Sequence, residues 1–263
     1  MRINNNITAI NSHRQYGLNN NAIGKNVEKL SSGFRVNRAG DDAAGLAISE
    51  KMRTQIRGLN MASKNSQDGI SLVQTAEGAM QTAHNIMQRM RELAVQARNG
   101  TNDTPIDKPA LDLEYKQLDL EINQIRDTVK FNDMTVFGLQ FTIQSGANSA
   151  DITTFSVGGL NGPGGTISTE EDAAIQIGRL TEAINSLSTT RATLGAIQNR
   201  LEFKIQNLDN SAENLAAAES RIRDTDMAKM MTEFTKNNIL FQASTAMLAQ
   251  ANSLPQSVLQ LLG

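Results

Sequence analysis

Residues 111–129 read LDLEYKQLDLEINQIRDTV, and this stretch has the clearest periodicity in the chain. Its large apolar residues recur at alternating spacings of four and three: Leu111, Tyr115, Leu118, Ile122, Ile125 and Val129. Such a heptad pattern places them along one face of a helix, where they form a seam for partner helices. Asp107 is a candidate N-cap for this helix, and Pro109 is tolerated in its first turn.

Two longer stretches on either side predict partner helices. The first begins after Asp41-Asp42 and runs to about Arg98, a length of roughly 80 Å in helical form. Its four internal glycines each weaken the helix but allow a partner to approach closely. The second opens with the capping box Ser168-x-x-Glu171 and continues to Ile222. Three helices with complementary seams predict an elongated bundle, a rod of mainly α fold.

The composition agrees with a rod. The chain has 263 residues with no Trp, 2 Tyr and 8 Phe, against 26 Asn and 18 Gln. Because large aromatic residues usually fill thick interiors, their scarcity favours narrow seams of Leu, Ile, Met and Ala between helices.

A different character marks residues 131–165. Seven of the 19 glycines lie between Gly138 and Gly165, and apolar residues alternate with polar ones around Phe141 and Phe155. These patterns predict a small β-hairpin, followed by a turn or surface loop over residues 158–165. The loop lacks the strand, spacing and helix of a dinucleotide-binding fingerprint.

The two ends of the chain carry apolar stripes that suggest an assembly surface. Residues 227–262 hold 14 large apolar side chains, while the first forty residues hold a broken counterpart interrupted by Gly17, Gly24 and Asn19-Asn20-Asn21. The positions predicted to pair and polymerise are Ile3, Ile7, Ile10, Val27, Leu30, Phe34, Met227, Phe234, Leu240, Phe241, Met247, Leu248, Leu254 and Leu261. A stripe of this kind is also typical of an ordinary intramolecular core.

Free energies favour assembly over a solitary fold for these ends. Full burial of the 14 C-terminal side chains would contribute about 20–40 kcal/mol, whereas ordering 36 residues costs about 36–70 kcal/mol of backbone entropy. Two facing helices still leave apolar surface in water. We therefore predict terminal segments that are disordered in the monomer and fold against each other and against neighbouring subunits.

Several function classes are disfavoured by composition. The chain has no Cys, only His13 and His84, and a net charge of −2, so we expect no thiol chemistry, no metal site, no cofactor and no nucleic-acid partner. We find no zinc, Walker or nucleophile-elbow motif, and therefore expect no catalytic residues and no enzyme. The first 38 residues carry six Lys or Arg against Glu28 alone, which leaves anionic lipid binding open, but we expect no membrane insertion. No apolar h-region of a classical signal peptide is present.

Several motifs resemble those of bacterial flagellin. The stretches that carry the likeness are LSSGFRVN at 30–37, DDAAGLAISE at 41–50, AESRIRDTDMA at 218–228, FTKNNIL at 234–240 and QSVLQLL at 256–262. The resemblance extends over almost everything except residues 134–168, where many relatives insert large outer domains. The chain is therefore similar to a short flagellin.

The resemblance implies a fold and a set of partners. Residues 1–40 and 225–263 would form the two halves of an inner two-helix coiled coil, and residues 41–224 a helical rod domain with the hairpin at about 131–165. The subunit would leave the cell through the flagellar export apparatus, held by an export chaperone, and polymerise as a homopolymer into an extracellular motility filament bounded by hook-associated and cap proteins.

A second implied partner is the host Toll-like receptor that senses flagellin. Residues 88–96, QRMRELAVQ, resemble the stretch that engages this receptor, with Glu114 at a further contact. The implied receptor-binding residues are Gln88, Arg89, Glu92, Leu93, Gln96 and Glu114, and we expect Leu93 to be exposed beside Arg89. Plain bundle surface is the alternative interpretation of this stretch. For the whole chain, the alternatives are a hook–filament junction protein and a receptor-binding or adhesive module.

Overall fold

The described part of the computed structural model contains five α-helices, one 3-10 turn and four short strands. It covers residues 6–102 and 106–262, with side chains described at 6–101 and 106–253. The predicted mainly α fold with a small hairpin is confirmed. Contacts divide the chain into two units, one of residues 55–213 and one of residues 1–54 with 214–263. The domain boundaries predicted at 40/41 and 224/225 stay a prediction.

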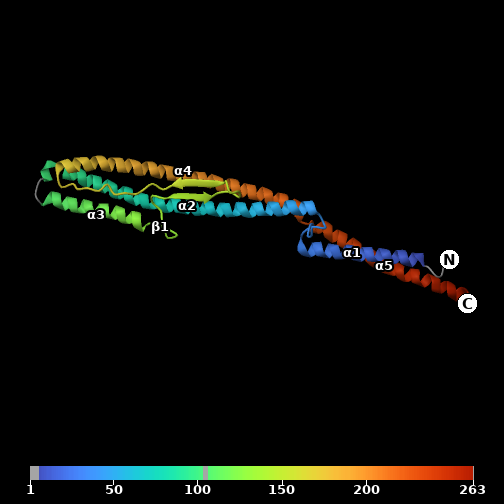
Figure 1. Cartoon of the computed structure of the whole chain (residues 1–263). Coiled ribbons are helices and arrows are strands. Elements are labelled where there is room, and N and C mark those ends of the chain that lie inside the picture. The colour runs from blue at the N-terminus through green and yellow to red at the C-terminus, as the bar shows by residue number, and fades with distance from the viewer. Residues whose placement is uncertain (1–5, 103–105, 263) are drawn as a thin grey trace. The chain divides into compact units, whose positions relative to one another are not determined.

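Three helices build the bundle of the first unit (Figure 1). They are α2 (Ala43–Ala97), α3 (Asp107–Thr128) and α4 (Glu170–Arg223), of which α2 and α4 also reach into the second unit. The predicted heptad face of α3 lies in the core, with Tyr115 and Ile122 completely buried. The α2 and α4 helices supply the facing layers of Met and Leu side chains: Met80, Met87, Met90, Leu93, Leu180, Leu187 and Leu194.

Two helix starts differ from the sequence prediction. The cap of α4 is Thr169, whose Oγ1 accepts a hydrogen bond from the Asp172 backbone N–H (3.1 Å), so the predicted Ser168-x-x-Glu171 box is wrong by one residue. The Ile167 N–H donates to Asp112 on α3 (2.8 Å), which ties the residue before the predicted box to another helix. At α3 the N-cap is Ile106, which makes no side-chain cap hydrogen bond, and Asp107 is instead the first helical residue.

The predicted β-hairpin is present over the bundle. Strands β3 (Gln140–Gln144) and β4 (Ile152–Ser156) pair antiparallel, with Phe141 opposite Phe155. This hairpin lies close to two glycines of α2, because a Cβ at Gly69 would collide with the Ile143 side chain and one at Gly58 would meet Ala147. At Gly58 and Gly69, the segment that approaches α2 closely is therefore the hairpin region, while Gly78 has open space beside it.

A second, shorter hairpin was not predicted. Strands β1 (Lys130–Phe131) and β2 (Met134–Thr135) are joined by Asn132 and Asp133, whose φ angles are 49° and 62°. Asn and Asp tolerate this left-handed region, which a tight two-residue hairpin turn requires at both positions.

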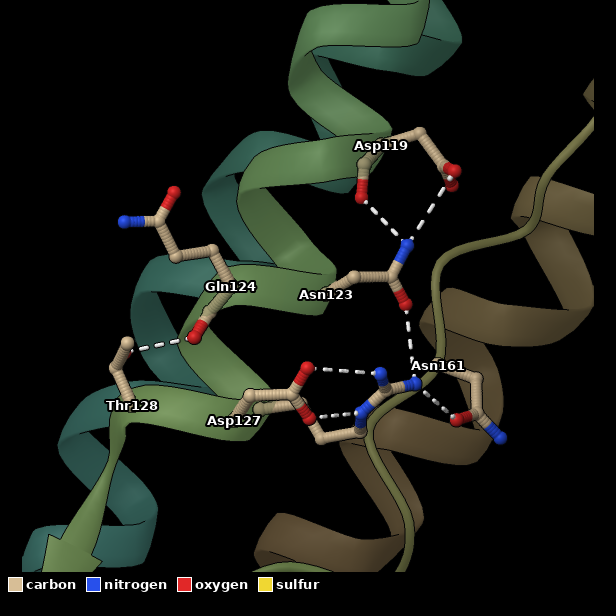
Figure 2. Close-up of polar contacts among 7 residues, drawn as sticks. Asp119, Asn123, Gln124, Asp127, Thr128 and Asn161 are labelled. Atoms are coloured by element: carbon tan, nitrogen blue, oxygen red, sulfur yellow. Dashed lines mark hydrogen bonds and ion pairs between the residues drawn. The ribbon is translucent and has the colours of Figure 1, made fainter.

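The segment after β4 is more than the surface loop predicted for residues 158–165. Leu160 is buried, and polar side chains of α3 bind the segment (Figure 2). Asp119 Oδ1 accepts from the Gly164 N–H (3.0 Å), and Arg126 donates to Asn161 Oδ1 (3.2 Å). The neighbouring Asp127 holds the Arg126 guanidinium in place (2.8 Å) and raises its pKa. The segment is thus fixed to the bundle by hydrogen bonds spaced along one helix.

The second unit contains the two terminal helices. Helix α1 (Ile7–Ser32) and helix α5 (Met227–Leu262) run antiparallel side by side, so the start of α1 lies beside the C-terminal part of α5 (Figure 1). Both segments adopt the paired helical form, and the predicted disorder of the free monomer stays a prediction. No helix in the described part of the chain is long and apolar enough to span a membrane.

Candidate functional site

Local capping signals set the limits of the terminal helices. The Asn6 side chain accepts from the Ala9 N–H at the start of α1, and Gly33, with φ 74°, ends this helix. Asp226 Oδ1 accepts from the N–H groups of Ala228 (3.0 Å) and Lys229 (3.1 Å) at the start of α5. Asp226 therefore caps the N-terminus of α5.

The contact between α1 and α5 is partly polar. Asn19 is only 7% exposed, and its Nδ2 donates to Ser244 Oγ (2.8 Å) and to the Leu240 carbonyl (3.3 Å). Asn6 Nδ2 donates to the Ala251 carbonyl (2.7 Å), and the rings of Tyr16 and Phe241 lie 4.9 Å apart. A buried amide inside a helix pair costs stability but fixes the register. Asn19 and Ser244 were not among the predicted positions, because spacing within one segment does not show which residues of two distant helices meet.

Much of the predicted apolar stripe faces solvent. Ile10 is 61% exposed and Met247 62%, although both are large apolar side chains on the paired helices. Of the other predicted positions, those exposed are Ile7, Val27, Met227 and Leu240, and those half-buried are Leu30, Phe34, Phe234, Phe241 and Leu248. Ile3 lies outside the described residues, as do the side chains of Leu254 and Leu261. The structure adds Leu18, Met231 and Ile239 to the exposed set.

Exposure on this scale distinguishes the pair from a closed core. Monomeric proteins rarely leave broad apolar patches in water, and such patches usually mark interfaces. The pair buries Asn, Ser and Ala while it exposes Ile, Leu and Met, which is the reverse of an intramolecular core. The surface of α1 and α5 is therefore a candidate assembly site.

A clasp joins the segments that lead into the terminal helices. Phe34 and Asp224 form an antiparallel bridge, and the Arg35 N–H donates to the Arg223 carbonyl (2.6 Å). The Arg223 guanidinium lies 4.7 Å from the centre of the Phe34 ring and binds Glu50 (2.6 Å). Half-buried Phe34 thus belongs to this clasp between the two linking segments and serves as a cation–π partner there.

A separate polar surface lies on α2 and α3. Arg89 donates to Glu114 Oε1 through Nε (3.0 Å) and Nη2 (2.9 Å), and through Nη1 to Glu92 Oε2 (3.2 Å). The hydrogen bonds from Glu114 and then Glu92 raise the Arg89 pKa. The predicted receptor residues Gln88, Arg89, Glu92, Gln96 and Glu114 are all exposed. Gln88, Glu92 and Gln96 line one groove of about 830 Å³.

The expectation that Leu93 is exposed is wrong. Leu93 is 0% exposed and packs in the bundle core. It lies three residues after Met90 and four before Ala97, both buried, so its helical spacing assigns it to the core face. Val95 is the apolar residue of this stretch that faces solvent.

Metal chemistry has no support within the described residues, where no group of three His, Asp or Glu side chains is placed to hold an ion. His13 and His84 both lie on helices, and His84 Nε2 pairs with the Gln88 amide (2.9 Å).

Comparison with known proteins gives matches at both ends of the chain. Residues 3–142 match the bacterial flagellin N-terminal helical region, and residues 177–262 match the bacterial flagellin C-terminal helical region.

Whole-length relatives and a solved structure agree with these matches. The chain is 56% identical to a flagellin of Halalkalibacterium halodurans and 50% identical to a flagellin of Bacillus subtilis. It is 46% identical to flagellin FlaB2 of Treponema pallidum, and each of the three alignments covers both chains completely. The crystal structure of Bacillus cereus flagellin superposes with a TM-score of 0.51 and 34% identity, over 59% of this chain and 94% of that one.

Proposed function

Because the chain belongs to the bacterial flagellin family, we propose that the exposed faces of α1 and α5 are the surface through which its copies assemble. The chain is a structural subunit of the bacterial flagellar filament and serves motility. One observation carries the assignment of the surface. The terminal pair buries small and polar residues against itself and leaves Ile10, Leu240 and Met247 in water.

Assembly through this surface couples folding to polymerisation. The pair covers only one side of each helix, so a single copy recovers only part of the hydrophobic free energy that ordering both segments requires. A second copy that covers the remaining apolar side chains supplies the rest. Folding of the terminal segments and growth of the filament are then a single event.

Sedimentation tests this assignment. Wild type seeded with short filament fragments should pellet, whereas a chain without its last forty residues should stay in the supernatant. The double variant Ile10→Asp with Leu240→Asp should behave like the truncated chain, because both side chains face solvent in one copy and tolerate charge there. The matched control is Ile175→Asp, an exposed apolar residue of the bundle. Polymer formed normally by the double variant would refute the assignment.

The other partners of the chain follow from the family resemblance. We propose export of the unfolded subunit by the flagellar export apparatus, a chaperone that holds the C-terminal segment, and growth of an extracellular filament between hook-associated and cap proteins. The exposed apolar side chains of α5 support the proposal of a chaperone, because an unassembled helix with such a surface would otherwise associate non-specifically. Calorimetric titration of the chaperone against the full chain and the truncated chain tests this, with binding expected for the full chain alone.

A second candidate function is recognition by the host Toll-like receptor that senses flagellin. The supporting observation is the exposed network in which Arg89 joins Glu92 of its own helix to Glu114 of α3, next to Gln88 and Gln96. Hydrogen bonds within the network pre-orient the guanidinium, which lowers the entropy lost when a partner binds. Leu93 is buried in the bundle core on the same helix and is not part of the exposed surface.

Receptor signalling by the monomer tests this second function. Arg89→Ala and Glu114→Ala should each lower potency, while Lys116→Ala, an exposed residue of the same helix as Glu114, should not. Unchanged potency in both network variants would remove the network from the receptor surface. Leu93→Ala is unsuitable as a probe of contact, since it opens a cavity in the core.

A further inference from the structure

Methionines are distributed unevenly between the bundle and the terminal pair. Four of the 11 methionines lie in the 36 residues of α5: Met227, Met230, Met231 and Met247. Three of these face solvent in one copy, with Met227 48% exposed, Met231 51% and Met247 62%. In the bundle core, Met80, Met87 and Met90 are at most 2% exposed, whereas Met61 and Met134 of the same unit are 57% and 47% exposed. One chain therefore carries an accessible set and a shielded set of the same side chain.

Of the accessible methionines, Met227, Met231 and Met247 lie on the candidate assembly surface of α5. Met247 lines a groove of about 330 Å³ between the two helices, together with Gln15 of α1 and Leu240 of α5. Met227 and Met231 follow one another on the first turns of the same helix. All three side chains are thus exposed to water in a single copy, on the surface proposed above for assembly.

Oxidation changes what these side chains can do. A peroxide transfers one oxygen atom to the thioether sulfur, the O–O bond breaks, and the second oxygen leaves as water, so the sulfur is oxidised and the peroxide is reduced. The product, a sulfoxide, is polar and is a strong hydrogen-bond acceptor, and it disrupts interfaces that methionine fills. Burial of that oxygen against apolar side chains without a donor is costly.

We propose that Met227, Met231 and Met247 form an oxidation-sensitive site that admits reduced copies to the polymer and excludes oxidised ones. The inference rests on the proposed function, because the partner that covers the site is a second copy of this chain. Assembled copies shield their own thioethers, so the site senses peroxide only before assembly. Because Met80, Met87 and Met90 are buried, peroxide does not reach them and the bundle core stays unoxidised during the same treatment.

Peroxide treatment of the monomer tests the inference with two readouts. Peptide mass spectrometry should find sulfoxide at Met227, Met231 and Met247 and little at Met80, Met87 and Met90. Sedimentation after seeding should show a critical concentration raised roughly tenfold or more, since each buried unpaired acceptor is worth about a factor of ten in equilibrium. Methionine sulfoxide reductases acting on both epimers should restore the polymer.

A matched pair of variants separates this site from general damage. The triple variant Met227→Leu, Met231→Leu and Met247→Leu conserves side-chain volume and should polymerise with or without peroxide. The control Met61→Leu with Met134→Leu removes two exposed methionines of the bundle and should remain sensitive.

Three outcomes would overturn the inference. One is normal polymerisation of wild type with sulfoxide confirmed at all three positions, and another is a triple variant that assembles untreated but is lost after peroxide. Equal oxidation of the buried and exposed sets is the third. Failure of untreated wild type to polymerise would instead refute the proposed function, and the inference would fall with it.

Discussion

The bundle and the terminal pair use similar residues to opposite effect. In the bundle, Met and Leu side chains from α2 and α4 close around Tyr115 and Ile122 of α3, and all are buried within one copy. In the terminal pair, the buried residues are Asn19, Ser244 and Ala251, the rings of Tyr16 and Phe241 meet at 4.9 Å, and large apolar side chains such as Ile10 and Met247 face outward. The bundle thus buries its large apolar side chains within one copy. The terminal pair instead exposes side chains of the same kind, which are available for contact with neighbouring copies.

This difference separates stability from assembly in one molecule. Substitutions in the bundle should change the free energy of unfolding of the single copy. Substitutions on the outer face of the pair should change polymerisation and leave that free energy almost unaltered. Single substitutions in each region test whether the free energy of unfolding and polymerisation change independently.

The largest effect is expected for Leu93→Ala. Removal of a fully buried Leu should lower the free energy of unfolding by about 2–5 kcal/mol, because the side chain leaves a cavity. Urea denaturation followed by circular dichroism measures this loss. The matched control is Val95→Ala two residues away, which is exposed and should change the free energy by less than about 0.5 kcal/mol. Equal effects of the two variants would contradict the core position of Leu93.

The next effect concerns the polar contact inside the terminal pair. Asn19→Ala removes hydrogen bonds to Ser244 and to the Leu240 carbonyl, which should weaken the pair by about 1–2 kcal/mol. Hydrogen exchange in the filament should become faster along α1 and stay unchanged along α3. Asn20→Ala, at an exposed position of the same helix, controls for the higher helix propensity of Ala. Faster exchange along α3 as well would show that the two regions are not separable.

A smaller effect is expected for the hydroxyl of Tyr115. This group contacts the Gly164 carbonyl (3.4 Å) and Gln176 Oε1 (3.3 Å), so Tyr115→Phe should cost about 0.5–1.5 kcal/mol at neutral pH. Denaturation of the bundle measures it. An unaltered free energy of unfolding would mean that the segment after β4 stays bound to the bundle without this hydrogen bond.

The same phenol gives the bundle a dependence on alkaline pH. Burial raises the Tyr115 pKa above its ordinary value of 10.0. A group whose pKa is raised by folding stabilises the folded state fully below its unfolded pKa, and this stability is lost as the pH rises above that value. Wild type should therefore lose stability above about pH 10 more steeply than Tyr115→Phe. Parallel curves for the two chains would contradict the burial.

The smallest effect is expected for Arg89→Ala. Its ion pairs with Glu92 and Glu114 are solvent-exposed, and such pairs contribute little to stability. The thermal midpoint of the bundle should therefore not change measurably, although the receptor response should. A clear drop in the midpoint would show that the network holds α2 and α3 together.

Sequence periodicity predicted most of the fold because helix faces repeat locally. The seam of α3, the start of α2 after Asp42 and the presence of a hairpin around Phe141 and Phe155 followed from local spacing, whereas the register that pairs Phe141 with Phe155 did not. The cap of α4 was misplaced by one residue because the hydrogen bond from Ile167 to Asp112 depends on another helix. The short β1–β2 hairpin was missed because it has too few residues to show alternation.

The candidate sites likewise contain features that local sequence reveals and features that depend on contacts between distant residues. The apolar stripes at both ends could be found from sequence alone, but the residues that meet between α1 and α5 could not, since Asn19 and Ser244 are far apart in the chain. Leu93 was assigned to the surface because the resemblance, rather than its spacing from Met90, determined the choice.

The sequence by itself determined where helices form and that the ends carry more apolar surface than one copy can hide, because both depend on composition and short-range spacing. Only the tertiary structure decided which side of each terminal helix faces its partner, which leucine of α2 is core, and which loop is fixed to α3. These depend on contacts between residues distant in the chain, where packing and hydrogen-bond geometry select one arrangement among the many that the same periodicity allows.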